Sequence, residues 1–545
     1  MERIVETDDG LGRDTEVLIA QLGARALRYI FNLSQGEYED LTLGSKLSSR
    51  ITGDTELFPM FRQFALLVRD QGNKLFVSHS WAQFLFSPVG DSTFVMFVRS
   101  HFGNLDPEIS YEESPDGILR ILARDLYVAA LLPNPEERFY FGGGQFVSGY
   151  LGHPLRHSFE DGVMTDIDLG RLFPKIDASG NRTGYVYRSS GEGGTVDLMS
   201  LACCCLNYGE VVCRVQGREL SPESIAEGAI EGLNSLRAGV RGEEFEIPVV
   251  VGVAGNLAEG MAQVSLGGAV LRRLCAVDRD RLVPRSLAAA EGRVPDEDGG
   301  DLILTFGVPG TLNFSIDGEL PIDRCEDGIS TAETRRRIDN ILLASIISDD
   351  DRKMAVKEKW SVSLGPFSGG GIEYPIGDSR FHGPHPLIDE EFSETWEAQV
   401  NAIENCDQGK LTVSRSRLLS AVDELRSPED ALVDALIVWE SFFGDGGEIV
   451  FKISACMAWL LCPGVGQYHE RVAMKKRLAK IYALRSKIVH GGSAKSRESL
   501  ILAVGEAIDA AAKTIRLMVG ERNELLSLSP REKNEYILLG KFTAQ

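Results

Sequence analysis

The sequence predicts a multidomain protein of the α+β class, with a mixed α/β N-terminal region followed by an all-α helical bundle. At 545 residues the chain is too long for one hydrophobic core. Strand-like and helix-like segments alternate through the first two-thirds, whereas helical patterns dominate afterwards. We therefore expect four parts: a mixed α/β region at 1–190, a second α/β region at 191–364, a Gly/Pro-rich linker with a lead-in helix at 365–410, and a helical domain at 411–545.

Four segments in the first two-thirds predict strands. Residues 92–99 and 183–188 are rich in β-branched and aromatic side chains, which are typical of strands. Residues 246–252 and 301–306 are short apolar runs that suit strands buried on both faces. Both α/β regions are therefore expected to contain sheet.

Two helix starts stand out between these strands. Ser221 can cap a helix, Pro222 fits its first turn, and apolar residues then recur at helical spacing. A second helix is expected to start at Ser330, with Glu333 completing a capping box.

The linker is rich in glycine and proline, and in the helices after it apolar residues recur at helical spacing. Residues 365–371 and 377–386 carry the clearest loop signals in the chain. Downstream, Ser427 and Pro428 repeat the start signal of the earlier helix, and Gly491 with Gly492 gives a stop signal. The expected helices are 412–426, 428–443, 448–461, 470–490 and 497–519.

Charge is distributed unevenly along the chain. The net charge is −23, which by itself argues against binding to a polyanion. Residues 411–545, however, contain 19 Lys and Arg against 16 Asp and Glu, a net of +3. Within them, residues 471–487 hold no acid and seven basic side chains: Arg471, Lys475, Lys476, Arg477, Lys480, Arg485 and Lys487. A basic segment therefore lies within an acidic protein.

Other features of the composition point to a cytoplasmic protein that does not enter a membrane. The N-terminus is too acidic for a secretory signal, and the apolar stretch at 453–465 is too short to span a bilayer. The nine cysteines include the run Cys203-Cys204-Cys205 but no Cys-x-x-Cys pair. We expect reduced thiols and neither a metal nor a cofactor.

The basic segment ends at an arginine and a histidine five residues apart, Arg485 and His490. A guanidinium holds phosphate charge and an imidazole moves protons near neutral pH, so this pair can break an RNA backbone without metal. The spacing alone is weak, because Arg380 and His385 show it too within the linker. Helical context and the glycine stop distinguish the first pair.

The flanks of this pair carry a resemblance to a known family. The stretches Ala435-Leu-Ile-Val-Trp-Glu-Ser-Phe-Phe443 and Tyr482-Ala-Leu-Arg-Ser-Lys-Ile-Val-His-Gly491 lie within residues 411–520. This region resembles the Apea-like branch of the HEPN superfamily. By position, Arg485 and His490 match the signature pair of that family, and Glu440 matches the acidic residue of its early helix. Many relatives carry an amide side chain after the arginine, where this chain has Ser486.

The resemblance implies a metal-independent endoribonuclease that acts as a homodimer or higher oligomer. It also implies antiviral (anti-phage) defence by growth arrest, with tRNA as one candidate substrate. The acidic N-terminal region would then sense a phage-derived or ligand trigger, or restrain the nuclease. RNA-binding residues are expected on the basic segment, namely Arg471, Lys475, Lys476, Lys480 and Lys487.

Helix geometry adds the requirement for two copies. Five residues on one helix correspond to about 140° of rotation and a rise of about 7.5 Å, so Arg485 and His490 do not share a face. A two-fold dimer would place two copies in one cleft, where arginines neutralise the phosphate and histidines divide base and acid duties. The products would be a 2′,3′-cyclic phosphate and a 5′-hydroxyl, and DNA would resist cleavage.

Simpler interpretations of the same residues remain open. Arg485 can be an ordinary helix arginine, His490 a C-cap, and Glu440 a paired acid in an apolar helix. The basic segment can be a solvated face, and Tyr482 can serve packing alone. The alternative function is a non-catalytic protein that dimerises through its bundle and binds a ligand or partner. Residues 252–260 predict a turn and not a nucleotide loop, because they lack the P-loop pattern.

Overall fold

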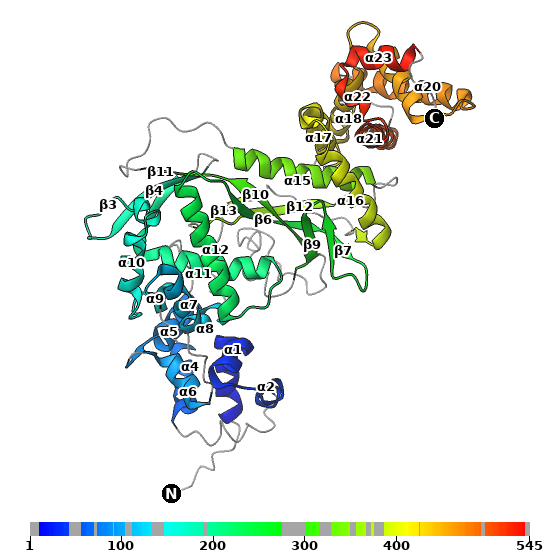
Figure 1. Ribbon diagram of the computed structural model, residues 1–545. Helices are drawn as coiled ribbons and strands as arrows, with labels where there is room; N and C mark the ends of the chain where they lie inside the picture. The colour runs from blue at the N-terminus through cyan, green and yellow to red at the C-terminus, as the bar shows by residue number, and fades with distance from the viewer. Residues whose placement is uncertain are drawn as a thin grey trace.

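The computed structural model divides into a helical N-terminal part, a central sheet with helices on both faces, and a helical bundle (Figure 1). The mixed α+β class is confirmed. The structure describes residues 10–42, 56–69, 74–90, 92–103, 112–132, 146–188, 193–274, 301–315, 329–348, 356–366, 372–374, 386–423, 426–491 and 496–539. The pair Arg380 and His385, Gly492 and most of the glycine-rich linker lie outside these residues.

The N-terminal part is built around one aromatic-rich core that includes Phe61, Trp81 and Phe159. Its described helices are α1 (Gly10–Phe31), α2 (Gln35–Thr42), α4 (Leu57–Arg69), α5 (Lys74–Leu85), α6 (Phe94–His101), α7 (Pro115–Asp125), α8 (Tyr127–Leu131), α9 (Val147–Tyr150), α10 (Arg156–Thr165) and the 3-10 helix η2 (Leu169–Leu172). The short strands β1 (Pro88–Val89) and β2 (Ser92–Thr93) pair with each other.

The strand predicted at 92–99 is wrong. Only Ser92 and Thr93 are extended, and helix α6 follows them. Within α6, Val95 and Val98 are buried three residues apart, which places both on the core side of the helix. Packing in the aromatic core therefore overrides the strand preference of these side chains.

Helices α11 (Leu198–Val215) and α12 (Pro222–Val240) join the N-terminal core to the sheet. Their backbones touch at Gly209 and Gly228, because a Cβ built on Gly209 would lie 2.3 Å from the carbonyl oxygen of Ile225. The predicted start of α12 is confirmed, since Ser221 accepts a hydrogen bond from the backbone N–H of Ser224. The cysteine run lies in α11 and is buried.

α11 is also the one helix in the described ranges that is long and apolar enough to cross a membrane. Most of it, 89%, is buried inside the protein. Its apolar composition is therefore explained by the two cores that it separates.

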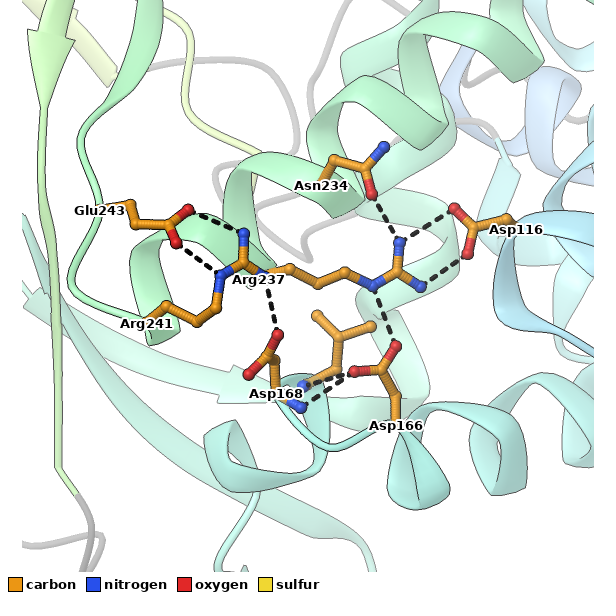
Figure 2. A network of polar contacts seen from close by, with 8 residues as sticks. Asp116, Asp166, Asp168, Asn234, Arg237, Arg241 and Glu243 are labelled. Atoms are coloured by element: carbon orange, nitrogen blue, oxygen red, sulfur yellow. Dashed lines mark hydrogen bonds and ion pairs between the residues drawn. The ribbon is translucent and has the colours of Figure 1, made fainter.

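Charged side chains at the C-terminal end of α12 tie it to the N-terminal part (Figure 2). The guanidinium of Arg237 donates to both oxygens of Asp116, at 3.0 and 2.6 Å, and its Nε donates to Asp166 at 2.9 Å. One turn on, Arg241 donates to Asp168 and Glu243. These contacts fix the end of α12 against α7 and the turn before η2.

The central sheet has six strands in the order β13-β12-β6-β10-β9-β8, and every pairing is antiparallel. Their bounds are β6 (Phe245–Ala254), β8 (Gln263–Leu266), β9 (Ala269–Arg273), β10 (Asp301–Gly310), β12 (Lys357–Ser363) and β13 (Ile372–Tyr374). The predicted strands at 246–252 and 301–306 are confirmed as β6 and β10, which pair with Ile303 opposite Gly252.

A smaller sheet contains β3 (Lys175–Ile176), β4 (Arg182–Arg188), β5 (Gly193–Asp197) and β11 (Leu312–Phe314), so the strand predicted at 183–188 is confirmed as β4. After Gly255 the chain forms β7 (Asn256–Leu257), which pairs in parallel with β14 (Leu387–Ile388).

The two faces of the large sheet pack against different helices. Val250 and Ile303 lie in a cluster with Val212 of α11. Val249 and Val251, which point to the other face, belong to a core shared with α15 (Ile329–Ser348) and α16 (Glu390–Glu404). The helix predicted to start at Ser330 is confirmed as α15, which begins at Ile329, and the Glu333 carboxylate accepts from Arg336. The side chain of Ser330 lies outside the described part of the chain, so the predicted capping box stays a prediction.

The C-terminal helices are α17 (Gln408–Ala421), α18 (Pro428–Phe443), α19 (Ile449–Leu461), α20 (Tyr468–Val489), α21 (Arg497–Val519), α22 (Glu524–Ser527) and α23 (Pro530–Leu538). The predicted bounds of α18 and α21 are confirmed, and those of α19 and α20 differ by one or two residues. α17 begins four residues before the predicted start, because Asp407 caps it by accepting from the backbone N–H of Gly409, and it ends at Ala421, five residues before the predicted end. One continuous core runs from the sheet through α15 and α16 into this bundle.

Candidate functional site

The site residues predicted from the sequence lie on two neighbouring helices of the bundle, α18 and α20. α20 is continuous from Tyr468 to Val489, and His490 is its C-cap. The backbone N–H of His490 donates to the carbonyl oxygen of Ser486, and Gly491 follows at φ +81°. The glycine therefore ends the helix in the left-handed conformation that the sequence predicts.

Glu440, Tyr482 and Arg485 form a polar cluster between the two helices. The hydroxyl of Tyr482 donates to Glu440 Oε1 at 2.5 Å, and Arg485 Nη1 lies 3.6 Å from the same oxygen. Trp439, next to Glu440, is buried and donates from its indole N–H to the carbonyl oxygen of Ala507 on α21. Glu440 is thus held by packing on one side and faces α20 on the other.

The proton of Tyr482 stays on the hydroxyl at neutral pH. Burial raises the pKa of Tyr482 to about 12, and the hydrogen bond to Glu440 and the charge of that carboxylate add to the shift, while Arg485 opposes it. Tyr482 is therefore a hydrogen-bond donor at this site, and the carboxylate of Glu440 accepts.

Glu440 holds Arg485 in place, but the N–H donors of the Arg485 guanidinium are not all used. Its 3.6 Å approach to Glu440 is an ion pair and exceeds hydrogen-bond length. Its Nε is buried and has no hydrogen-bond partner in the part of the chain that the structure describes. About a quarter of the side chain, 24%, remains exposed. A guanidinium has five N–H donors in a fork that matches a phosphate, so this side chain keeps capacity for another acceptor.

His490 lies apart from that cluster. Its side chain is exposed and makes no hydrogen bond or ion pair with the described residues. Arg485 instead lies on the side of α20 that faces α18. Within one chain, the structure therefore brings Arg485 to Glu440 and leaves His490 on a different face, as the spacing predicts.

The outer face of α20 carries a row of small and basic side chains, which we call the cationic stripe. Its seven members alternate in steps of four and three residues, and all are exposed: His469, Ala473, Lys476, Lys480, Ala483, Lys487 and His490. This spacing keeps them on one face of the helix. The only acid of α20, Glu470, lies off the stripe, so no carboxylate interrupts it.

Two of the predicted RNA-binding residues, Arg471 and Lys475, lie off the stripe and contact other parts of the bundle. Arg471 donates to the carbonyl oxygens of Cys462 and Gly464, and its guanidinium stacks 4.1 Å from the ring of Trp459. The ammonium of Lys475 lies 4.1 Å from the Phe451 ring. Their role in RNA binding stays a prediction, whereas Lys476, Lys480 and Lys487 are placed where a ligand can reach them.

Tyr482 is the residue that the sequence analysis undervalued. We expected it to serve packing, but its hydroxyl is the closest donor to Glu440 in the described part of the chain. The two residues are 42 positions apart, so no local pattern connects them. The described residues also contain no group of three His, Cys, Asp or Glu arranged to hold a metal ion.

Comparison with known protein families, with curated proteins and with solved structures finds no match for this chain. The resemblance of residues 411–520 to HEPN domains therefore stays a prediction that depends on the residues themselves. The geometry of α18 and α20 is the basis for the proposals that follow.

Proposed function

We propose that the C-terminal helices form a HEPN-type, metal-independent endoribonuclease that acts as a homodimer. Arg485 and His490 are the catalytic residues in this proposal, and Glu440 positions the arginine. The observation that carries the proposal is the unsaturated guanidinium of Arg485, which is held by Glu440 yet keeps a buried Nε without an acceptor. Arg415 also has a buried Nε without a described acceptor, but its Nη1 donates to the side chains of Asn340 and Gln408. Arg485 makes no such hydrogen bond with a described residue, and a buried unpaired donor costs about 1–3 kcal/mol.

Two copies supply what one copy lacks. Arg485 and His490 lie on different faces of α20, so a single chain does not direct both at one phosphate. A two-fold axis beside α20 would bring the arginine of one protomer and the histidine of its partner into one cleft. His490 is exposed and uncommitted among the described residues, which fits a group that completes a site across an interface.

The proposed reaction is an internal transfer at phosphorus. One His490 takes the proton of the ribose 2′-hydroxyl, and the 2′-oxygen forms its bond to phosphorus as the bond to the 5′-oxygen breaks. The second His490 protonates that leaving oxygen, while Arg485 stabilises the charge on the non-bridging oxygens. The products are a 2′,3′-cyclic phosphate and a 5′-hydroxyl, so no redox partner or metal enters the balance.

We infer a regulatory role for the rest of the chain from charge and connectivity. Residues 1–410 carry a net charge of −26, and one core connects the sheet with the bundle. An acidic body of this kind repels RNA except where cations are exposed. In this proposal it senses a phage-derived or ligand trigger in the cytoplasm, with antiviral defence as the setting and tRNA as one candidate substrate.

The experiment is cleavage of total RNA by the purified full-length protein in EDTA, followed by mapping of the ends. We expect cyclic phosphates from the wild type and loss of cleavage in Arg485→Ala and His490→Ala. Matched controls are Lys513→Ala, an exposed cation of α21, and His157→Ala, an exposed histidine of α10. Cleavage that requires a divalent metal, or that survives both site substitutions, contradicts the proposal.

The second candidate function is a non-catalytic module that dimerises and binds a ligand or partner. The contact of Tyr482 and Arg485 with Glu440 favours it, because these contacts also serve to fasten α18 to α20. Folded Arg485→Ala protein that dimerises and remains as protective or toxic in cells as wild type would contradict the nuclease and favour this alternative.

A further inference from the structure

The lysines of the cationic stripe on α20 have no ion-pair partner in the described part of the chain. Some other cations of the bundle are matched with acids: Arg417 with Asp434, Lys452 with Asp445, and Arg531 with Glu535. Lys410 and Lys513 are exposed as well, but they lie on α17 and α21 and outside this row. Lys476, Lys480 and Lys487 have no such carboxylate among the described residues. Three unpaired ammonium groups on one face of an acidic protein indicate a surface for an anionic ligand.

The stripe is long and lies on one continuous helix. From His469 to His490 it follows one uninterrupted helix over about 31 Å, at 1.5 Å per residue. α20 lies at the outer edge of the bundle, away from the sheet (Figure 1). The backbone that carries the lysines is therefore already ordered, and a rigid partner can meet the row without ordering the backbone of either molecule.

The chemistry of the stripe favours contacts to phosphates over contacts to bases. It contains no Phe, Tyr or Trp, whereas proteins that hold single strands usually stack bases on such rings. The aromatic residues of α20 lie elsewhere: Tyr482 is buried against Glu440, and Tyr468 precedes the stripe. Ala473 and Ala483 leave space between the lysines, so a bulky backbone can approach the helix closely.

We propose that the cationic stripe binds the phosphate backbone of double-helical RNA, without regard to sequence, and thereby delivers structured RNA to His490 at the end of the same stripe. This inference rests on the proposed nuclease function and adds to it the class of substrate. Lysine contributes a point charge and no base-specific geometry, so affinity depends on charge and on the regular path of the duplex.

The test is binding of a non-cleavable probe to the full-length protein. A 20-base-pair 2′-O-methyl RNA duplex keeps the helical form but lacks the attacking hydroxyl, so affinity is measured without cleavage. We expect two duplexes of unrelated sequence to bind equally, and each constituent single strand at least tenfold more weakly. Single strands that bind as tightly as the duplex, or a strong preference for one sequence, overturn the proposal.

Substitution of the three lysines of the stripe provides a second test of the proposal. The triple variant Lys476→Ala, Lys480→Ala, Lys487→Ala should lose about tenfold to a hundredfold in affinity, and its salt dependence should fall by about one unit of slope per lysine. The matched control removes three exposed cations elsewhere on the bundle, with Lys410→Ala, Lys513→Ala and Arg531→Ala. Equal losses in both triple variants would show that net charge alone attracts RNA, which overturns a role for the stripe.

The two proposals fail separately. If the duplex binds through the stripe but unmodified RNA is never cut, the nuclease is wrong and the stripe stands. If the triple variant cuts structured RNA with unchanged KM, the stripe is wrong and the nuclease stands. Circular dichroism and thermal unfolding check that the variants fold, which we expect because all three side chains are exposed.

Discussion

Two arginines in this protein show opposite ways of using a guanidinium. Arg237 fills its donors with acceptors: both oxygens of Asp116, one of Asp166, and the side chain of Asn234 (Figure 2). Arg485 has one carboxylate at ion-pair distance and a buried Nε with no described partner. Both are partly buried, with 16% and 24% of the side chain exposed.

The difference indicates what each arginine is for. A saturated guanidinium cannot take another ligand without breaking existing bonds, so Arg237 stabilises the fold. A guanidinium with free N–H donors can bind an anion without breaking existing hydrogen bonds, so binding costs little free energy. The comparison therefore predicts that Arg485 matters for function and Arg237 for stability.

The largest expected effect is the loss of cleavage in Arg485→Ala. Removal of a group that stabilises transition-state charge costs about a hundredfold to a thousandfold in kcat. The free energy of unfolding should change by about 1 kcal/mol or less, because a loose ion pair to Glu440 and a 5.9 Å contact with the Tyr482 ring are lost. Kinetics and urea unfolding of the same preparation test both parts. A large loss of stability in Arg485→Ala would make this arginine structural and remove the contrast.

Arg237→Ala should show the reverse pattern. It leaves Asp116 and Asp166 without their shared partner, and we expect a loss of about 2–3 kcal/mol in the free energy of unfolding. Cleavage per folded molecule should not change. The control is Arg218→Ala, which removes an exposed arginine 3.6 Å from Glu231 and should cost less than about 1 kcal/mol. If Arg237→Ala is no less stable than this control, the number of hydrogen bonds that a guanidinium makes does not indicate how much it stabilises the fold.

A smaller effect is expected when the support of Arg485 is weakened through Tyr482→Phe. The lost hydrogen bond to Glu440 should cost about 1–2 kcal/mol of stability. If Glu440 positions Arg485, kcat should fall several-fold while KM stays constant. Tyr536→Phe on α23 is the control, since the Tyr536 hydroxyl bonds no described residue. Equal kcat in both variants would show that Tyr482 contributes to packing and does not help to position Arg485.

The smallest expected effect concerns acid. Burial by itself raises the pKa of Asp166, but hydrogen bonds from the N–H groups of Leu169 and Asp168 and from Arg237 bring it below its ordinary value. A carboxylate with a lowered folded-state pKa stabilises the fold above its unfolded pKa, and this contribution is lost as pH falls through the folded pKa. Urea unfolding between about pH 3 and pH 7 should show a shallower acid decline in Arg237→Ala than in wild type. Identical slopes contradict this role for Asp166.

Elements defined by local chemistry could be predicted from the sequence, and those defined by packing could not. α12 and α18 begin where Ser221 and Ser427 cap them, because each hydroxyl accepts a nearby backbone N–H. Residues 92–99 have the composition of a strand, but the core makes most of them a helix. The start of α17 depends on Asp407, a cap that we overlooked.

The same division holds at the candidate site. The 140° offset between Arg485 and His490 follows from helix geometry, and the exposed positions on α20 agree with it. No sequence pattern predicts that Arg471 bonds the carbonyls of Cys462 and Gly464, since those acceptors belong to the turn before α20. The Tyr482–Glu440 hydrogen bond depends likewise on how α18 lies against α20.

The shared core of sheet and bundle has a consequence for how this protein can be dissected. Trp396 of α16 donates to the carbonyl oxygen of Ile341 in α15, and Leu411 and Leu418 of α17 belong to the same buried cluster. A fragment that starts at residue 411 would expose to solvent the apolar side chains that α15 and α16 cover in the full-length protein. The bundle therefore shares its stability with the sheet, and truncation experiments need to keep α15 and α16 together with the helices that hold Arg485.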